Sequence, residues 1–223
     1  MSRNSSFKIS YIGGGSRFVV TLLHGIASRA EDIKMMGYGM ELTLMDINLR
    51  RANEMKEYAD ITAKQIGLNL STIVTDDIRT ALTDADWILY SVGFPAELKE
   101  KKQYYLSKLG NIHEETAPRL AVEAALLWNS IKKVGDVVCR LAPKSLFSTL
   151  VNPTDVIAPA FEKAFGIRSI GMCVEVTNLM RWLSYYLQVD ENEMEIDYIG
   201  ANHAGWVSKL ILVEAPGGSR QQA

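Results

Sequence analysis

The sequence predicts an α/β fold in which a mostly parallel sheet carries helices on both faces. Short apolar stretches typical of strands alternate along the chain with longer stretches of helical periodicity. Glycine, aspartate, asparagine or cysteine lies at the end of several strand-like stretches. Ligands of parallel sheets bind at the carboxyl ends of the strands, so these residues are the candidates for a functional site.

The expected elements follow the chain in order. Strands are expected where apolar residues cluster, at 7–12, 41–45, 71–75, 87–92, 146–151 and 169–173. Helices are expected at 18–30, 49–65, 80–85, 96–135 in two pieces, 153–165 and 178–187. Residues 194–200 and 206–213 are expected to pair as antiparallel strands, and the polar residues 215–223 are expected to form a disordered tail.

The composition indicates a soluble cytoplasmic protein with a large core. Of the 223 residues, 48% are hydrophobic, and 24 basic side chains nearly balance 26 acidic ones. No stretch is basic or apolar enough to indicate a nucleic-acid or membrane partner. Cys139 and Cys173 are too few for a disulfide framework, and residues 1–6 lack the apolar core of a signal peptide.

A glycine-rich turn links the first expected strand to the first helix. It contains Gly13, Gly14, Gly15, Ser16 and Arg17, and Phe18 stands in place of the third glycine of the common dinucleotide fingerprint. Such a turn lets a pyrophosphate approach the backbone at a helix N-terminus, whereas the alternative is an ordinary tight turn.

Asp46 ends the second expected strand. An acid there accepts hydrogen bonds from ribose hydroxyls and favours NAD over NADP, whereas the alternative is a cap for the following helix. The glycine turn and this acid together predict a dinucleotide site. Asn152, which precedes Pro153 at the end of another strand, either binds the cofactor or a sugar hydroxyl or caps a helix, and by itself the capping role is favoured.

Cys173 and His203 lie far apart in sequence, yet both follow expected strands and are candidates to share a divalent metal. Taken singly, Cys173 is typical of a buried apolar cysteine, His203 of a turn histidine bonded to backbone, and Glu175 of a surface acid at a helix end. His24 and His113 lie in helical patterns without a partner motif and are interpreted as structural.

Taken together, these motifs resemble glycoside hydrolase family 4, the NAD- and divalent-metal-dependent glycosidases. The resemblance extends from about residue 7 to 207 and depends on Ile12–Ser16, Asp46–Asn48, Asn152-Pro153, Gly171–Cys173 and Gly200–His203. It implies a Rossmann-like fold similar to that of lactate and malate dehydrogenases. It also implies a homo-oligomer that acts on a small glucoside, a 6-phosphoglucoside or a uronide.

The resemblance implies a reaction that departs from two-carboxylate glycoside hydrolysis. NAD at the Gly13–Ser16 turn removes hydride from sugar C3, and a metal, usually manganese, held by Cys173 and His203 polarises the oxygens at C2 and C3. Loss of the C2 proton then expels the leaving group, water adds, and the hydride returns. Glu175 matches an acid of the galacturonidase-like branch and is the candidate catalytic residue.

The chain also departs from the family pattern. Family members are about twice as long, so residues 1–200 are expected to form the NAD-binding domain and 201–223 the start of a largely missing catalytic domain. No residue matches the catalytic base, the usual arginine after strand 87–92 is replaced by Gly93–Lys99, and Val174 follows the metal cysteine. Two alternatives remain open: a hydroxy-acid dehydrogenase with His203 as base, and a non-catalytic nucleotide-binding fragment.

Overall fold

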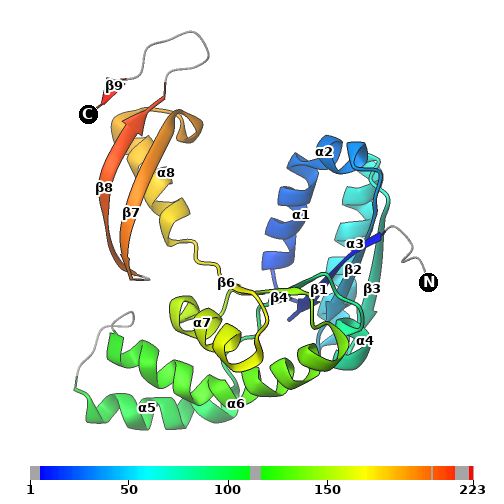
Figure 1. Ribbon diagram of the computed structural model, residues 1–223, viewed down its shortest axis with the longest axis horizontal. Coiled ribbons are helices and arrows are strands. Elements are labelled where there is room, and N and C mark those ends of the chain that lie inside the picture. The colour runs from blue at the N-terminus through cyan, green and yellow to red at the C-terminus, as the bar shows by residue number, and fades with distance from the viewer. Residues whose placement is uncertain (1–5, 111–116, 202, 214–220, 223) are drawn as a thin grey trace.

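The computed structural model describes residues 6–110, 117–201, 203–213 and 221–222. Six of the strands within these ranges are parallel, namely β1 (Ser6–Ile12), β2 (Gly39–Met45), β3 (Leu70–Thr75), β4 (Trp87–Tyr90), β5 (Leu146–Thr149) and β6 (Ser169–Gly171). They form one sheet in the order β3-β2-β1-β4-β5-β6 (Figure 1). This is the strand order of doubly wound dinucleotide-binding folds, and it confirms the predicted fold class.

Helices connect the strands and cover both faces of the sheet. They are α1 (Phe18–Ser28), α2 (Ala30–Met35), α3 (Leu49–Ile66), α4 (Ile78–Leu82), α5 (Lys99–Lys108), α6 (Ala117–Leu141), α7 (Thr154–Phe165) and α8 (Glu175–Leu187). Two short 3₁₀ turns, η1 (Ala96–Leu98) and η2 (Glu191–Glu193), precede α5 and follow α8.

The core is divided into two hydrophobic clusters, one on each face of the parallel sheet. On one face, Tyr11 of β1 and Leu44 of β2 pack against α1 and α3. On the other face, Ile12 of β1 and Phe147 of β5 pack against α4, α6 and α7. Neighbouring strand residues thus face opposite clusters, as the twofold alternation of a strand requires. The rings of Phe147 and Phe161 stack with their centroids 3.8 Å apart, which fixes α7 against the sheet.

Several predicted helix boundaries are wrong, because local interactions that the hydrophobic pattern does not reveal determine where these helices begin and end. The helix predicted at 18–30 ends at Ser28, because Arg29 leaves helical geometry, and α2 then begins at Ala30. The short helix predicted at 80–85 lies at 78–82, because the Asp77 carboxylate accepts hydrogen bonds from the backbone of Arg79 and Thr80 and so caps it. The helix predicted to end at Gly135 continues to Leu141.

An arm built from α8 and the antiparallel strands β7 (Met194–Ala201) and β8 (Ala204–Leu212) projects from the parallel-sheet body (Figure 1). The predicted antiparallel pair is therefore confirmed. The prediction of a disordered tail is wrong for Gln221 and Gln222, which pair with β8 as strand β9, while the rest of that prediction lies outside the described residues. Among the helices that the structure describes, none has the length and apolar character needed to cross a bilayer.

Gly135 lies in the interior of α6 beneath the ring of Phe165, and a Cβ atom added there would lie 2.3 Å from Phe165 Cε2. We expect Gly135→Ala to lower the free energy of unfolding by about 1–3 kcal/mol through overpacking. Gly25 is the matched control, because it lies in α1 and has no atom within 4 Å of an added Cβ. Gly25→Ala is expected to raise stability by about 0.5–1 kcal/mol, as measured by urea denaturation. A stabilising Gly135→Ala would contradict this account of α6–α7 packing.

Candidate cofactor cleft and metal site

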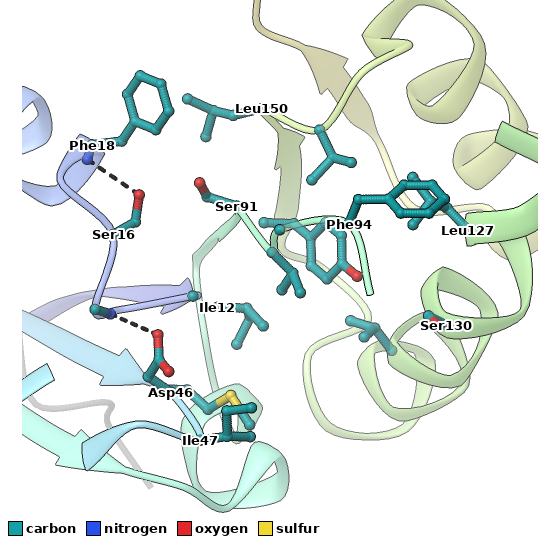
Figure 2. Close-up of a pocket in the computed structure, with 18 of the residues that line it drawn as sticks. Ile12, Ser16, Phe18, Asp46, Ile47, Ser91, Phe94, Leu127, Ser130 and Leu150 are labelled. Atoms are coloured by element: carbon teal, nitrogen blue, oxygen red, sulfur yellow. Dashed lines mark hydrogen bonds between the residues drawn. The ribbon is translucent and has the colours of Figure 1, made fainter. Parts of the chain in front are cut away.

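A cleft of about 830 Å³ opens at the carboxyl ends of β1, β2, β4 and β5 (Figure 2). The chain winds outward in opposite directions from β1 and β4, so the helices that follow these neighbouring strands leave toward opposite faces of the sheet. This switch point is where nucleotides bind in doubly wound sheets. Of the predicted cofactor residues, Gly13, Gly15, Ser16, Asp46 and Asn152 line the cleft.

The glycine turn lies in direct contact with the neighbouring strand ends. Gly13 and Gly14 both donate backbone hydrogen bonds to the carbonyl oxygen of Met45, at 2.9 and 2.8 Å. Gly13 has φ +94°, and an added Cβ would lie 2.2 Å from the carbonyl oxygen of Ser91. Side chains are therefore excluded where the backbone of the turn must pass between β2 and β4.

Two predicted residues of this turn do not line the cleft. Gly14 is buried, and an added Cβ there would lie 2.7 Å from Leu44 Cβ, so its contribution is to packing. Arg17 is exposed and occupies the N-cap position of α1 without a side-chain hydrogen bond to the helix. The first turn of α1 contains no acidic side chain, which leaves the positive end of the helix dipole available to an anion.

Asp46 links the turn to β2 and does not cap the following helix. Its Oδ2 accepts a hydrogen bond of 2.8 Å from the backbone N–H of Gly15 (Figure 2). Its Oδ1 accepts one of the same length from the backbone N–H of Asn48. Asn48 is the N-cap of α3, where its side chain accepts from the backbone N–H of Arg51. The capping alternative for Asp46 is therefore wrong, and its carboxylate faces the cleft.

Sequence reasoning missed several residues that line the cleft. Ser91 and Phe94 follow β4, Arg51 comes from α3, and Glu123 and Lys133 come from α6. A signal for Ser91 was present, because it lies at the carboxyl end of the apolar stretch that forms β4, the neighbour of β1. The α6 residues carried no such signal, since only the packing of that helix against the sheet brings them to the cleft.

Asn152 lies at the end of the cleft that is nearest to β5 and β6. Its peptide bond with Pro153 is cis. Pro153 is the N-cap of α7, so the predicted capping role of Asn152 is wrong.

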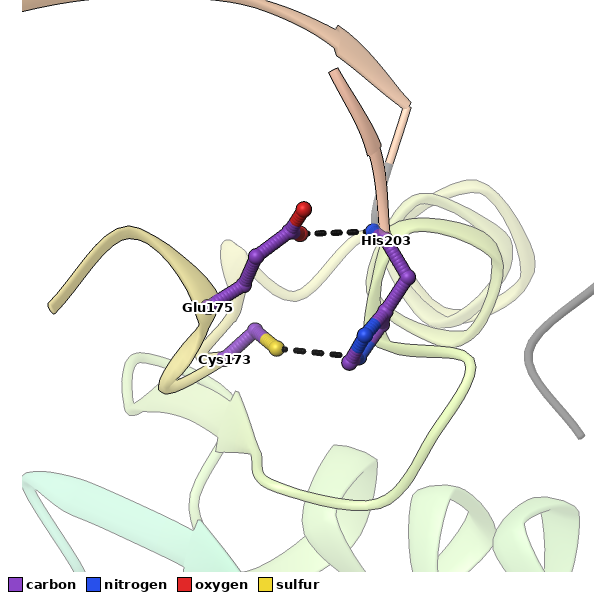
Figure 3. Close-up of side chains that lie close together, drawn as sticks. All are labelled: Cys173, Glu175 and His203. Atoms are coloured by element: carbon purple, nitrogen blue, oxygen red, sulfur yellow. Dashed lines mark hydrogen bonds between the residues drawn. The ribbon is translucent and has the colours of Figure 1, made fainter. Parts of the chain in front are cut away.

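Cys173, Glu175 and His203 meet where the arm joins the body (Figure 3). Cys173 Sγ and His203 Nε2 are 3.4 Å apart, and one ligand atom from each of the three side chains lies within 4.8 Å of the others. All three residues are half-buried, so neither the buried-cysteine nor the surface-acid alternative holds. Thiolate, imidazole and carboxylate are ligands that first-row transition metals accept, so the site fits a divalent metal.

Glu175 connects the start of α8 to the tip of the β7–β8 hairpin. Its Oε2 accepts a hydrogen bond of 2.6 Å from the backbone N–H of His203, and its Oε1 accepts one of 2.6 Å from the hydroxyl of Tyr198. His203 has φ +60°, an unusual backbone conformation for a residue other than glycine. The carboxylate therefore supports the backbone conformation that directs the imidazole toward Cys173.

His24 takes no part in this cluster. His24 Nε2 forms a hydrogen bond of 2.9 Å with the hydroxyl of Tyr58, which agrees with its structural interpretation. His113 lies outside the described residues.

The bond between Glu175 and Tyr198 gives a measurable pH dependence. The hydrogen bond to Glu175, together with burial and the negative charge of Glu175, raises the pKa of Tyr198 to about 12. We expect Glu175→Gln to lower this pKa toward the ordinary value of about 10, because the charge that opposes phenolate formation is removed. In the unaltered chain, the protonated Tyr198 hydroxyl stabilises the folded state fully below about pH 10. This contribution to the free energy of unfolding is lost as the pH rises toward 12.

The measurement is the ultraviolet absorbance of the phenolate, taken as the difference between each chain and its Tyr198→Phe counterpart. Glu195→Gln, on the same strand as Tyr198, is the matched control and is expected to leave the titration unchanged. A Tyr198 titration that is identical with and without Glu175 would contradict the hydrogen bond.

The fold has counterparts among proteins of known structure. A 6-phospho-alpha-glucosidase from gut microorganisms, solved in complex with NAD and Mn²⁺, matches with a TM-score of 0.76 and 20% identity, over 96% of this chain and 49% of that one. The lactate dehydrogenase of Eimeria maxima matches with a TM-score of 0.61 and 15% identity, over 90% of this chain and 54% of that one. These likenesses confirm the expected Rossmann-like, dehydrogenase-like fold.

Sequence comparison identifies the family. The phospho-alpha-glucosidase of Clostridium acetobutylicum is 24% identical over 212 residues, which are 92% of this chain and 46% of that protein. The probable 6-phospho-beta-glucosidase of Bacillus subtilis is 25% identical over 202 residues, 88% of this chain and 45% of that protein. The chain thus spans a little less than half the length of these curated relatives. Residues 8–189 match the model of the family 4 glycosyl hydrolases, and the chain belongs to that family.

Proposed function

We propose that this chain forms the NAD- and metal-binding part of a family 4 glycosidase that hydrolyses 6-phosphoglucosides. The observation that carries the proposal is the meeting of Cys173 and His203 at 3.4 Å beside the carboxyl edge of a dinucleotide-type sheet. The substrate class is supported by the two curated relatives, which are named as phosphoglucosidases. The dehydrogenase alternative is not favoured, because the family match is to glycosyl hydrolases.

The residues of this chain have separable tasks in the proposed reaction. Bound NAD would accept a hydride from sugar C3 and return it, while a divalent metal, with manganese the first choice, would polarise the oxygens at C2 and C3. The turn at Gly13–Ser16 would bring the pyrophosphate to the N-terminus of α1, whose dipole favours an anion, and Asp46 would accept hydrogen bonds from the ribose hydroxyls. Asn152 faces the reacting end of the cofactor or the sugar.

Cys173 and His203 are the proposed metal ligands. Glu175, the candidate catalytic residue of the sequence, is assigned here as a positioning residue, because its hydrogen bonds to Tyr198 and to the backbone of His203 hold the hairpin tip beside Cys173. Second-sphere contacts of this kind orient metal ligands and tune their affinity. The division into a cofactor domain at 1–200 and the start of a second domain at 201–223 stays a prediction, and its boundary falls within the β7–β8 hairpin.

The first test is calorimetric titration of NAD and of Mn²⁺ into the chain. We expect both to bind. We expect Cys173→Ala to raise the Kd for Mn²⁺ by more than roughly 10-fold, which is the cost of losing a residue that only supports a metal ligand. NAD binding should be retained in this variant. Cys139→Ala is the matched control, because that thiol contacts the Phe165 carbonyl in the α6–α7 interface. A chain that binds no NAD would overturn the proposed function.

A second test addresses the choice of cofactor. We expect NAD to bind at least about 5-fold more tightly than NADP, because the Asp46 carboxylate repels the 2′-phosphate of NADP. Asp46→Asn should reduce this preference, whereas Asp60→Asn, which removes an exposed acid of α3, should leave it unchanged. Equal affinities for both nucleotides in the unaltered chain would show that Asp46 does not face the ribose.

A further inference from the structure

Tyr11 carries a buried hydroxyl that the fold itself does not use. The residue is 1% exposed, and its hydroxyl oxygen makes no hydrogen bond of regular geometry within the described residues. Burying an unpaired hydroxyl destabilises a folded protein, and phenylalanine would fill the same space without that cost. The hydroxyl therefore suggests a hydrogen bond that is completed only when a ligand is bound nearby.

The surroundings of this hydroxyl lie at the cofactor cleft. Tyr11 is the next-to-last residue of β1, and its ring packs beneath α1 in the hydrophobic cluster that contains Val19. Burial raises the pKa of Tyr11, while the hydroxyls of Ser91 and Ser16 are close enough to offset part of this rise. Ser16 belongs to the glycine turn, Ser91 follows β4, and both line the cleft (Figure 2).

We infer that Tyr11 is a positioning residue for an anionic phosphate group bound at the glycine turn. Its hydroxyl donates a hydrogen bond to Ser16 or Ser91, and the serine hydroxyl then donates to a phosphate oxygen. A hydroxyl that accepts one hydrogen bond becomes a stronger donor in the next, so a short chain of this kind strengthens the contact with the anion.

The dipole of α1 agrees with a phosphate group as the ligand. The N-terminus of α1 lies at the same turn, and its first turn contains no acidic side chain. The inference rests on the proposed dinucleotide site and adds to it a residue outside the glycine fingerprint.

The experiment compares the binding of ADP and adenosine to the unaltered chain and to Tyr11→Phe by calorimetry. The two probes share the nucleoside and differ by the pyrophosphate, so their comparison isolates the phosphate contact. We expect Tyr11→Phe to raise the Kd for ADP by about 3- to 10-fold, the effect of one lost hydrogen bond, and to leave the Kd for adenosine unchanged. An unchanged Kd for ADP, or equal weakening of both probes, would overturn the inference.

Two further variants separate this role from a general effect on the fold. Tyr58→Phe removes a hydroxyl bonded to His24 away from the cleft, and it is expected to leave ADP binding unchanged. In a chain that carries Ser16→Ala and Ser91→Ala, Tyr11→Phe should have no further effect on ADP binding, because the chain of hydroxyls is already interrupted. Full additivity of the substitutions would count against the inference.

Nucleotide binding by the unaltered chain distinguishes failure of the proposed function from failure of the role inferred for Tyr11. If it binds neither ADP nor NAD, the proposed function fails and the inference fails with it. If it binds ADP and Tyr11→Phe binds ADP equally well, only the role of Tyr11 is lost. Tyr11→Phe should unfold at the same temperature as the unaltered chain or about 2–4 °C higher, because an unpaired buried hydroxyl is removed.

Discussion

The contact between the glycine turn and the ends of β2 and β4 is the constraint on which the rest of the cleft depends. The Met45 carbonyl accepts two backbone hydrogen bonds from the turn, and the Ser91 carbonyl occupies the space where Gly13 would carry a side chain. This contact sets where α1 begins and thus where its positive end lies. The same contact brings Ser16, Asp46 and Ser91 to one edge of the sheet.

A second constraint joins the arm to the body through the cluster of Cys173, Glu175 and His203. Cys173 belongs to the segment that leaves β6, whereas His203 lies at the tip of the β7–β8 hairpin, thirty residues later. Glu175 bonds to the backbone of that tip and to Tyr198 on β7, so the hairpin is held against the start of α8. The geometry of the cluster therefore depends on a carboxylate that need not contact the metal.

The sequence was sufficient for the order and type of the parallel strands, because apolar stretches ending in glycine or polar residues are local signals. It was also sufficient to nominate Cys173 and His203, although only the fold brings their side chains together. It did not resolve Asp46, because an acid before a helix is equally typical of a cap, and Asn48 two residues later takes that role. The continuation of α6 through Gly135 was also unpredictable, since glycine there accommodates the ring of Phe165, which is distant in sequence.

The hydrogen bonds of Asp46 to two backbone amides have a consequence for protein engineering. The carboxylate that faces the proposed ribose site also holds the backbone of Gly15 and Asn48. Cofactor preference and the integrity of the turn therefore depend on one side chain, so a substitution of Asp46 alone affects both. A redesign of nucleotide choice in this scaffold would have to supply new acceptors for two backbone amides before it could change the charge presented to the ribose.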